Sequence, residues 1–88
     1  MPEVNADPER LSQLAKTIRS SADELQQIAR VLARAVDGAV GRDAEMQRFQ
    51  QEFKQSLKTL TRLGETMKGQ YAPALQKKAA ALEQYRGR

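Results

Sequence analysis

The sequence predicts an all-α fold: an antiparallel two-helix hairpin with a longer, kinked second helix, which pairs with another chain in a four-helix bundle. Three observations predict it. Apolar residues recur at helical spacing along most of the 88 residues. Helix-favouring Ala, Leu, Gln, Glu, Lys and Arg dominate the composition. Near the middle, one short segment with Gly38 and Gly41 interrupts the pattern. The chain is therefore treated as a single helical-hairpin domain, residues 1–88.

The first helix is predicted over residues 8–38, after a flexible tail at residues 1–6. Asp7 is its expected N-cap, because its side chain accepts bonds from the free N–H groups of the first turn, and Pro8 fits the first helical position. Gly38 and Gly41 are expected to end the helix, and at least one of them is predicted to adopt a positive φ. The apolar arc of this helix spans roughly 160°, which is too wide for a single neighbour.

A turn is predicted over residues 39–42, and a second helix over residues 43–85 with Asp43 as N-cap. Phe49 and Phe53 are expected to fill the space beside the turn. Pro73 predicts a kink, because it has no N–H to donate and its ring crowds the preceding turn. The apolar positions shift register after it, as a stutter would shift them. The second helix is also longer, so the segment after Pro73 is expected to project beyond the first helix.

The apolar residues of both helices are the candidate site. The following are expected to form the hairpin core or a partner interface: Leu11, Leu14, Ile18, Leu25, Ile28, Leu32, Phe49, Phe53, Leu57, Leu60, Leu63 and Met67. The projecting segment is expected to contact a partner through Leu75, Leu82 and Tyr85.

The residue types argue against an enzyme. The chain has no Cys and no His, so the common nucleophile, neutral-pH base and metal ligand are missing. The serines have no histidine to activate them, the carboxylates form no forced pair, and no glycine-rich phosphate loop is present. We expect no catalytic residue, no cofactor and no metal site.

The charge is uneven. Residues 1–43 carry six basic and seven acidic side chains, whereas residues 44–88 carry nine and four. Lys54, Lys58, Arg62 and Lys68 form a basic stripe that suits phosphates, but no aromatic residues are interleaved to stack bases. Nucleic acid is thus the lesser expectation. No apolar stretch reaches the length of a membrane span, and no signal region is evident. A cytoplasmic protein is expected, with export without a cleaved signal peptide as the alternative.

A family resemblance adds to this reading. The order "DPERLSQLAKTIRSSADELQQI", a Gly-containing turn and then "F..F...L..L" resembles the WXG (ESAT-like) helical hairpins of type VII secretion, over roughly residues 6–85. The chain departs from that pattern twice. The turn "AVGRDAEM" lacks the signature Trp, and neither Tyr71 nor Tyr85 is followed four residues later by an acid, as the family's secretion signal requires.

The resemblance implies that the protein works by association. Members of that family form homodimers or heterodimers of hairpins, and they are secreted or help to deliver larger effectors. It implies a similar role here, with a related hairpin or a larger effector as partner. Two alternatives remain: a self-assembling needle- or filament-type subunit, and a basic nucleic-acid accessory protein.

Overall fold

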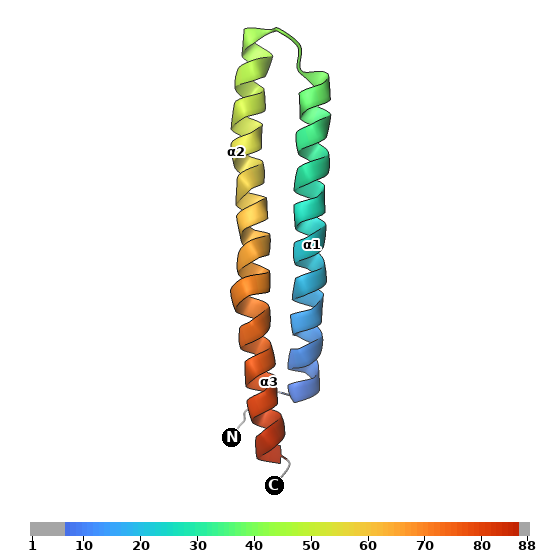
Figure 1. Ribbon diagram of the computed structural model, residues 1–88, viewed down its shortest axis with the longest axis vertical. Coiled ribbons are helices and arrows are strands. Elements are labelled where there is room, and N and C mark those ends of the chain that lie inside the picture. Colours follow the sequence, from blue (N-terminus) through green and yellow to red (C-terminus); the bar gives the residue numbers. More distant parts are fainter. Residues whose placement is uncertain (1–6, 87–88) are drawn as a thin grey trace.

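The structure, a computed structural model, describes residues 7–86 and the side chains of residues 7–85. The predicted tail at residues 1–6 lies outside the described residues. The described chain contains no strand and folds into helices α1 (Pro8–Ala39), α2 (Ala44–Thr66), the π-helix η1 (Met67–Tyr71) and α3 (Ala72–Arg86). The predicted all-α hairpin is confirmed: α1 forms one arm, and α2, η1 and α3 form a longer second arm (Figure 1).

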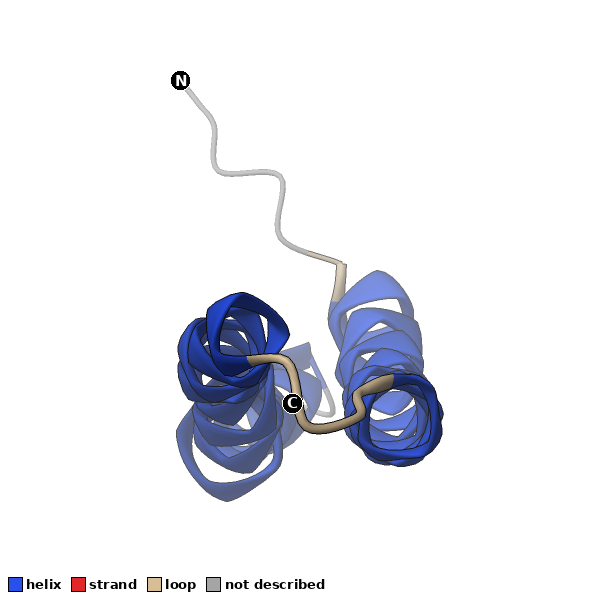
Figure 2. Ribbon diagram, turned by 90° about the horizontal axis from the view of Figure 1, so that it is seen from above, coloured by secondary structure: helices blue, strands red, loops and turns tan. Residues whose placement is uncertain are grey.

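The molecule is a rod. Its principal extents are 67 × 21 × 16 Å, and its radius of gyration is 19.4 Å. A compact domain of this length has a radius of gyration of about 12 Å. The two arms lie side by side, joined by one short loop (Figure 2). Each helix therefore has one neighbour, and much of its surface is left uncovered.

Two aspartates begin the arms, as predicted. Asp7 caps α1, and its Oδ1 accepts a 2.9 Å hydrogen bond from the backbone N–H of Glu9. Asp43 caps α2 in the same way, accepting from the N–H of Glu45 at 2.9 Å. Pro8 occupies the first turn of α1, where its missing N–H has no intrahelical acceptor to lose. These local signals fix where both arms start.

The predicted glycine-dependent turn is wrong. No described glycine has a positive φ, and Gly38 still belongs to α1, which ends at Ala39 instead of residue 38. The chain leaves the helix at Val40, whose φ of −87° and ψ of 127° are extended. Any residue adopts extended backbone, so neither Gly38 nor Gly41 is needed for its left-handed freedom.

Because of this extended exit, the overhang of the segment after Pro73 is shorter than predicted. The chain runs on from Val40 before α2 begins, so Asp37 lies beside Gln50 and Lys54 of α2. The register of the arms is thereby displaced, and Ala79 in α3 is buried against α1, where it shares a groove with Pro8. The segment after Pro73 therefore packs along α1 as far as Ala79, and only the end of α3 projects beyond α1 (Figure 1).

Small residues form the seam between the arms. On α1, the buried residues repeat every seven positions: Pro8, Ala15, Ala22, Ala29 and Val36. On the second arm, the buried residues are Leu57, Gly64, Ala72 and Ala79. The distance between packed helices depends on the side chains at the contact, so this composition brings the two backbones close together.

The π-helix keeps the second arm in register with this seam. The spacings between its buried residues are seven, eight and seven. The extra residue lies in η1, where the Ala72 N–H donates to the carbonyl of Met67, five residues back. The wider turn also precedes Pro73, whose ring would crowd the carbonyl of Gly69 in a regular α-helix. The predicted disturbance is therefore a one-residue insertion.

Candidate functional site

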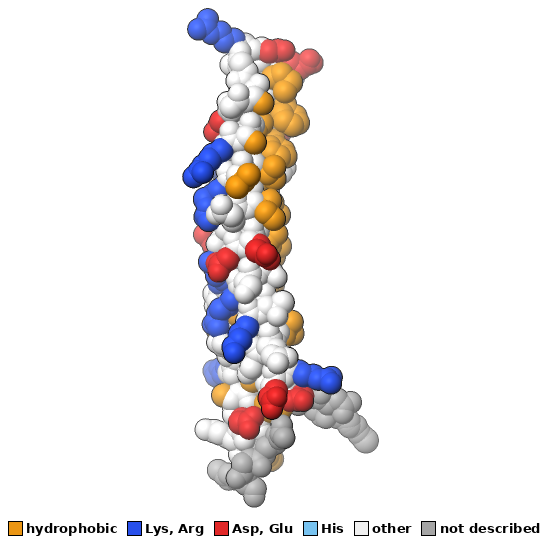
Figure 3. Space-filling model, turned by 90° about the vertical axis from the view of Figure 1, so that its right-hand side faces the viewer, with side chains coloured by type: hydrophobic (Ala, Val, Ile, Leu, Met, Phe, Trp, Pro, Cys, Tyr) orange, Lys and Arg blue, Asp and Glu red, His pale blue; other side chains and the backbone are white. Residues whose placement is uncertain are grey.

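The seam divides the hairpin into two unlike faces. On both arms, the positions three residues after each seam residue are apolar and several of those one residue before it are apolar too, whereas those four residues after it are mostly polar. Two antiparallel helices are related by a twofold axis perpendicular to their common plane, so equivalent sides of both arms lie on the same face. Seen from the α1 side, hydrophobic side chains follow one edge and Lys and Arg the other (Figure 3).

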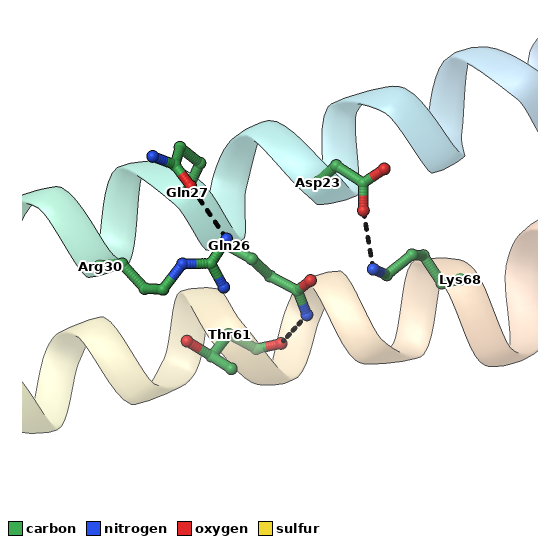
Figure 4. Close-up of polar contacts among 6 residues, drawn as sticks. All are labelled: Asp23, Gln26, Gln27, Arg30, Thr61 and Lys68. Carbon is green, nitrogen blue, oxygen red and sulfur yellow. Dashed lines mark hydrogen bonds and ion pairs between the residues drawn. The ribbon is translucent and has the colours of Figure 1, made fainter.

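On the polar face, side chains of the two arms contact each other across the seam. Lys68 Nζ lies 2.7 Å from Asp23 Oδ1, and Gln26 Nε2 donates to the backbone carbonyl of Thr61 at 3.3 Å. Figure 4 shows both contacts crossing from α1 to the second arm. At the other end of the arms, Arg19 donates to Gln76 in α3 at 2.9 Å. These contacts hold the two arms together along the polar face.

Asp37 is the best-partnered carboxylate of the polar face. Its Oδ1 lies 2.6 Å from Lys54 Nζ and accepts a 2.6 Å hydrogen bond from Gln50 Nε2. The hydrogen bond from Lys54, followed by that from Gln50, lowers the pKa of Asp37 below its ordinary value. These bonds tie the last turn of α1 to the second arm.

The apolar face has no cover within the described chain. Leu14, Ile28, Phe49 and Leu63 are 46%, 48%, 48% and 44% exposed, although each is a large apolar residue. Their neighbours on this face are only partly covered: Leu11, Ile18, Leu25, Leu32, Phe53, Leu60, Met67, Leu75 and Leu82. Of the predicted core residues, Leu57 alone is buried, because it lies in the seam.

The two phenylalanines lie together on this face near the turn. The ring centroids of Phe49 and Phe53 are 5.6 Å apart, and the ring planes differ by 9°. Phe53 is half-buried, whereas Phe49 is 48% exposed. Within one chain the stacked pair therefore borders the seam and does not fill an enclosed core.

The predicted contact group after Pro73 divides into two parts. Leu75 and Leu82 are half-buried and continue the apolar face along α3. Tyr85 is 83% exposed near the end of the described chain. Tyr71, the last residue of η1, also lies on this face, where it is 52% exposed. The apolar face thus extends over both arms.

Sequence reasoning missed the central role of the alanines. The predicted core consists of larger apolar residues, yet Ala15, Ala22 and Ala29 form the buried centre of the hairpin. Their seven-residue spacing was the signal that identifies a helix–helix seam. A small residue at that spacing permits close approach, whereas the leucines beside it are too large for the same position.

Neither a metal-binding cluster nor a membrane-spanning helix is found among the described residues. Residues 7–86 contain no group of three or more His, Cys, Asp or Glu side chains placed to hold a metal ion. None of the described helices is both long and apolar enough to cross a membrane. In comparisons with known proteins, no family model, curated protein or solved structure matches this chain.

Proposed function

We propose that this protein is a non-enzymatic association module whose apolar face docks on that of a second helical hairpin, forming a four-helix bundle. One observation carries the proposal: a hairpin that is closed on its polar face leaves a row of large apolar side chains half-exposed on the other. The biological role proposed with it is that of the small type VII secretion substrates or effector partner proteins that the sequence resembles.

The dimensions of the apolar face support a stable complex. The rod is 67 Å long and 21 Å wide, and a standard interface buries about 800 Å² on each partner. An apolar face that runs along both arms of such a rod has room for an interface of that size. Burying one Leu, Ile or Phe side chain fully contributes roughly 1.5–3 kcal/mol, so several half-exposed residues together offset the entropy lost when two chains pair.

The two alternatives have less support. The filament subunit considered above needs the segment after Pro73 to project, whereas that segment packs against α1 as far as Ala79. A nucleic-acid protein needs free cations, whereas Lys54 and Lys68 of the basic stripe are paired with Asp37 and Asp23. Binding to nucleic acid would also leave the apolar face without a role.

Sedimentation velocity over a micromolar concentration range tests the proposal. We expect the protein made alone to form a dimer, with a second copy occupying the place of any cognate hairpin. Ile28→Glu places a charge on the apolar face at a site that is 48% exposed in the single chain. It should therefore abolish association while circular dichroism stays helical. Ser20→Glu adds the same charge at an exposed position away from that face and should leave the dimer intact.

Two outcomes would count against the proposal. A helical 9.9 kDa species at every concentration would reject self-association, and the heterodimer would then be tested by co-purification with a hairpin encoded beside this gene. Equal dissociation by Ile28→Glu and Ser20→Glu would show that the apolar face is not the interface.

A further inference from the structure

The basic stripe that the sequence predicted on the second arm is divided by the fold. Lys54 and Lys68 are bound to Asp37 and Asp23 across the seam. Arg62 is exposed and lines none of the described grooves. Lys58 instead lies at a groove between α1 and α2. The four cations therefore do not act together as one continuous surface for a phosphate backbone.

The groove beside Lys58 has a cationic rim and an apolar floor. Arg30 from α1 and Lys54 and Lys58 from α2 line it. Ala29 and Leu57, both buried seam residues, form its floor. Arg30 donates to the side-chain oxygen of Gln27 on its own helix (Figure 4). Among the described residues, no carboxylate forms an ion pair with Arg30 or Lys58.

Asp37 shows how a carboxylate binds at the edge of this groove. Its Oδ1 lies 2.6 Å from Lys54 Nζ, and Gln50 donates to the same oxygen at 2.6 Å. These same two contacts are the largest causes of the lowered pKa of Asp37. One rim cation is thus already engaged by an acid of the chain, while neither of the other two is paired with a carboxylate of the described residues.

We propose that this groove binds the acidic side chains of a partner protein segment. Carboxylates suit the cations of Arg30 and Lys58, and a planar guanidinium binds a carboxylate through two parallel bonds. The aliphatic part of a Glu side chain fits the floor of Ala29 and Leu57. The groove lies on the polar face, so it stays open when the apolar face is occupied.

The charge pattern along the polar face favours a peptide over nucleic acid. Asp23 and Asp37 lie on this face on either side of Arg30 along α1. A long phosphate backbone running along the rod would meet the ion pairs of these two acids, in which Lys68 and Lys54 are already engaged, whereas a short acidic segment fits between them and meets Arg30 and Lys58. An acidic peptide is therefore the occupant that the surface fits. This second interaction is independent of the proposed pairing through the apolar face.

Fluorescence anisotropy with a labelled hexaglutamate peptide tests the inference at low ionic strength. The full chain should bind it saturably, and binding should weaken with added salt. The double variant Arg30→Gln, Lys58→Gln should weaken binding by about tenfold or more, because it removes two charge-assisted contacts. Lys16→Gln, Arg62→Gln removes the same net charge outside this groove and should weaken binding by less than about threefold.

Three results would overturn the inference. One is the absence of saturable peptide binding at protein concentrations up to about 1 mM. Another is an equal loss in both double variants, which would indicate a response to net charge only. The third is tighter binding of a labelled DNA duplex than of the peptide. Sedimentation of the same variants reports on the apolar face separately, since neither variant changes it.

Discussion

Gln26 of α1 covers the backbone of Gly64 in α2. A Cβ at position 64 would lie 2.9 Å from Gln26 Cγ and 3.0 Å from its Nε2. The same side chain donates to the carbonyl of Thr61. Gly64 is thus favoured by the side chain that crosses above it and not by its own φ, which is not positive.

This contact predicts a coupling between two substitutions. Gly64→Ala gains helix propensity of roughly 0.5–1 kcal/mol, but it displaces Gln26 and loses a hydrogen bond of about 1 kcal/mol. Alone, it should change the free energy of unfolding little. In a Gln26→Ala background it should stabilise by roughly 0.5–1 kcal/mol. Chemical denaturation of the four proteins of the cycle measures the coupling, and additive effects would contradict the contact.

The alanine seam predicts intolerance of larger side chains. Ala22 is fully buried, so Ala22→Leu should force the arms apart and destabilise the protein by about 1–3 kcal/mol. Ala81→Leu makes the same change at an exposed position of α3 and should stay within about 0.5 kcal/mol. Similar melting temperatures for the two variants would show that the seam is looser than described.

The extra residue of the π-helix predicts a tolerated deletion. Removing Gly69, which is exposed and has no neighbour near its Cβ position, restores a seven-residue spacing between Gly64 and Ala72. With Pro73→Ala made alongside, so that no proline ring crowds the regular turn, the hairpin should remain folded with equal or greater stability. Deleting Ser20 breaks the spacing of Ala15 and Ala22 and should cost several kcal/mol, on the order of the largest single-site effects. Thermal unfolding of the two deletion variants measures the loss of stability in each, and losses of similar size would refute the register argument.

The contacts of Asp37 predict a pH dependence. The Lys54 and Gln50 bonds lower its pKa in the folded protein. The stability that these bonds contribute is therefore fully present above the ordinary Asp pKa of about 3.9. It is lost as pH falls through the lower folded value. Asp37→Asn should therefore be less stable than the parent at neutral pH, and the difference should disappear in strong acid. A difference that persists there would assign the effect to packing instead of charge.

The sequence by itself determined the elements. Asp7 and Asp43 mark both helix starts because N-capping is local chemistry between a side chain and the next N–H groups. The apolar period fixed two long helices, and Pro73 marked where the second arm departs from regular α-helix. Each of these signals acts within a few residues, so it can be recognised in the sequence without knowing which residues of the other helix lie beside it.

Tertiary structure decided how those elements meet. The extended exit at Val40 sets which residues of the two arms face each other, and a displacement there moved Ala79 from an expected overhang into the seam. The choice of alanines over leucines for the buried centre depends on how closely the two backbones approach. A property that depends on the distance between two helices is not contained in the periodicity of either one, and this is why the leucines predicted as core lie half-exposed beside a seam of small residues.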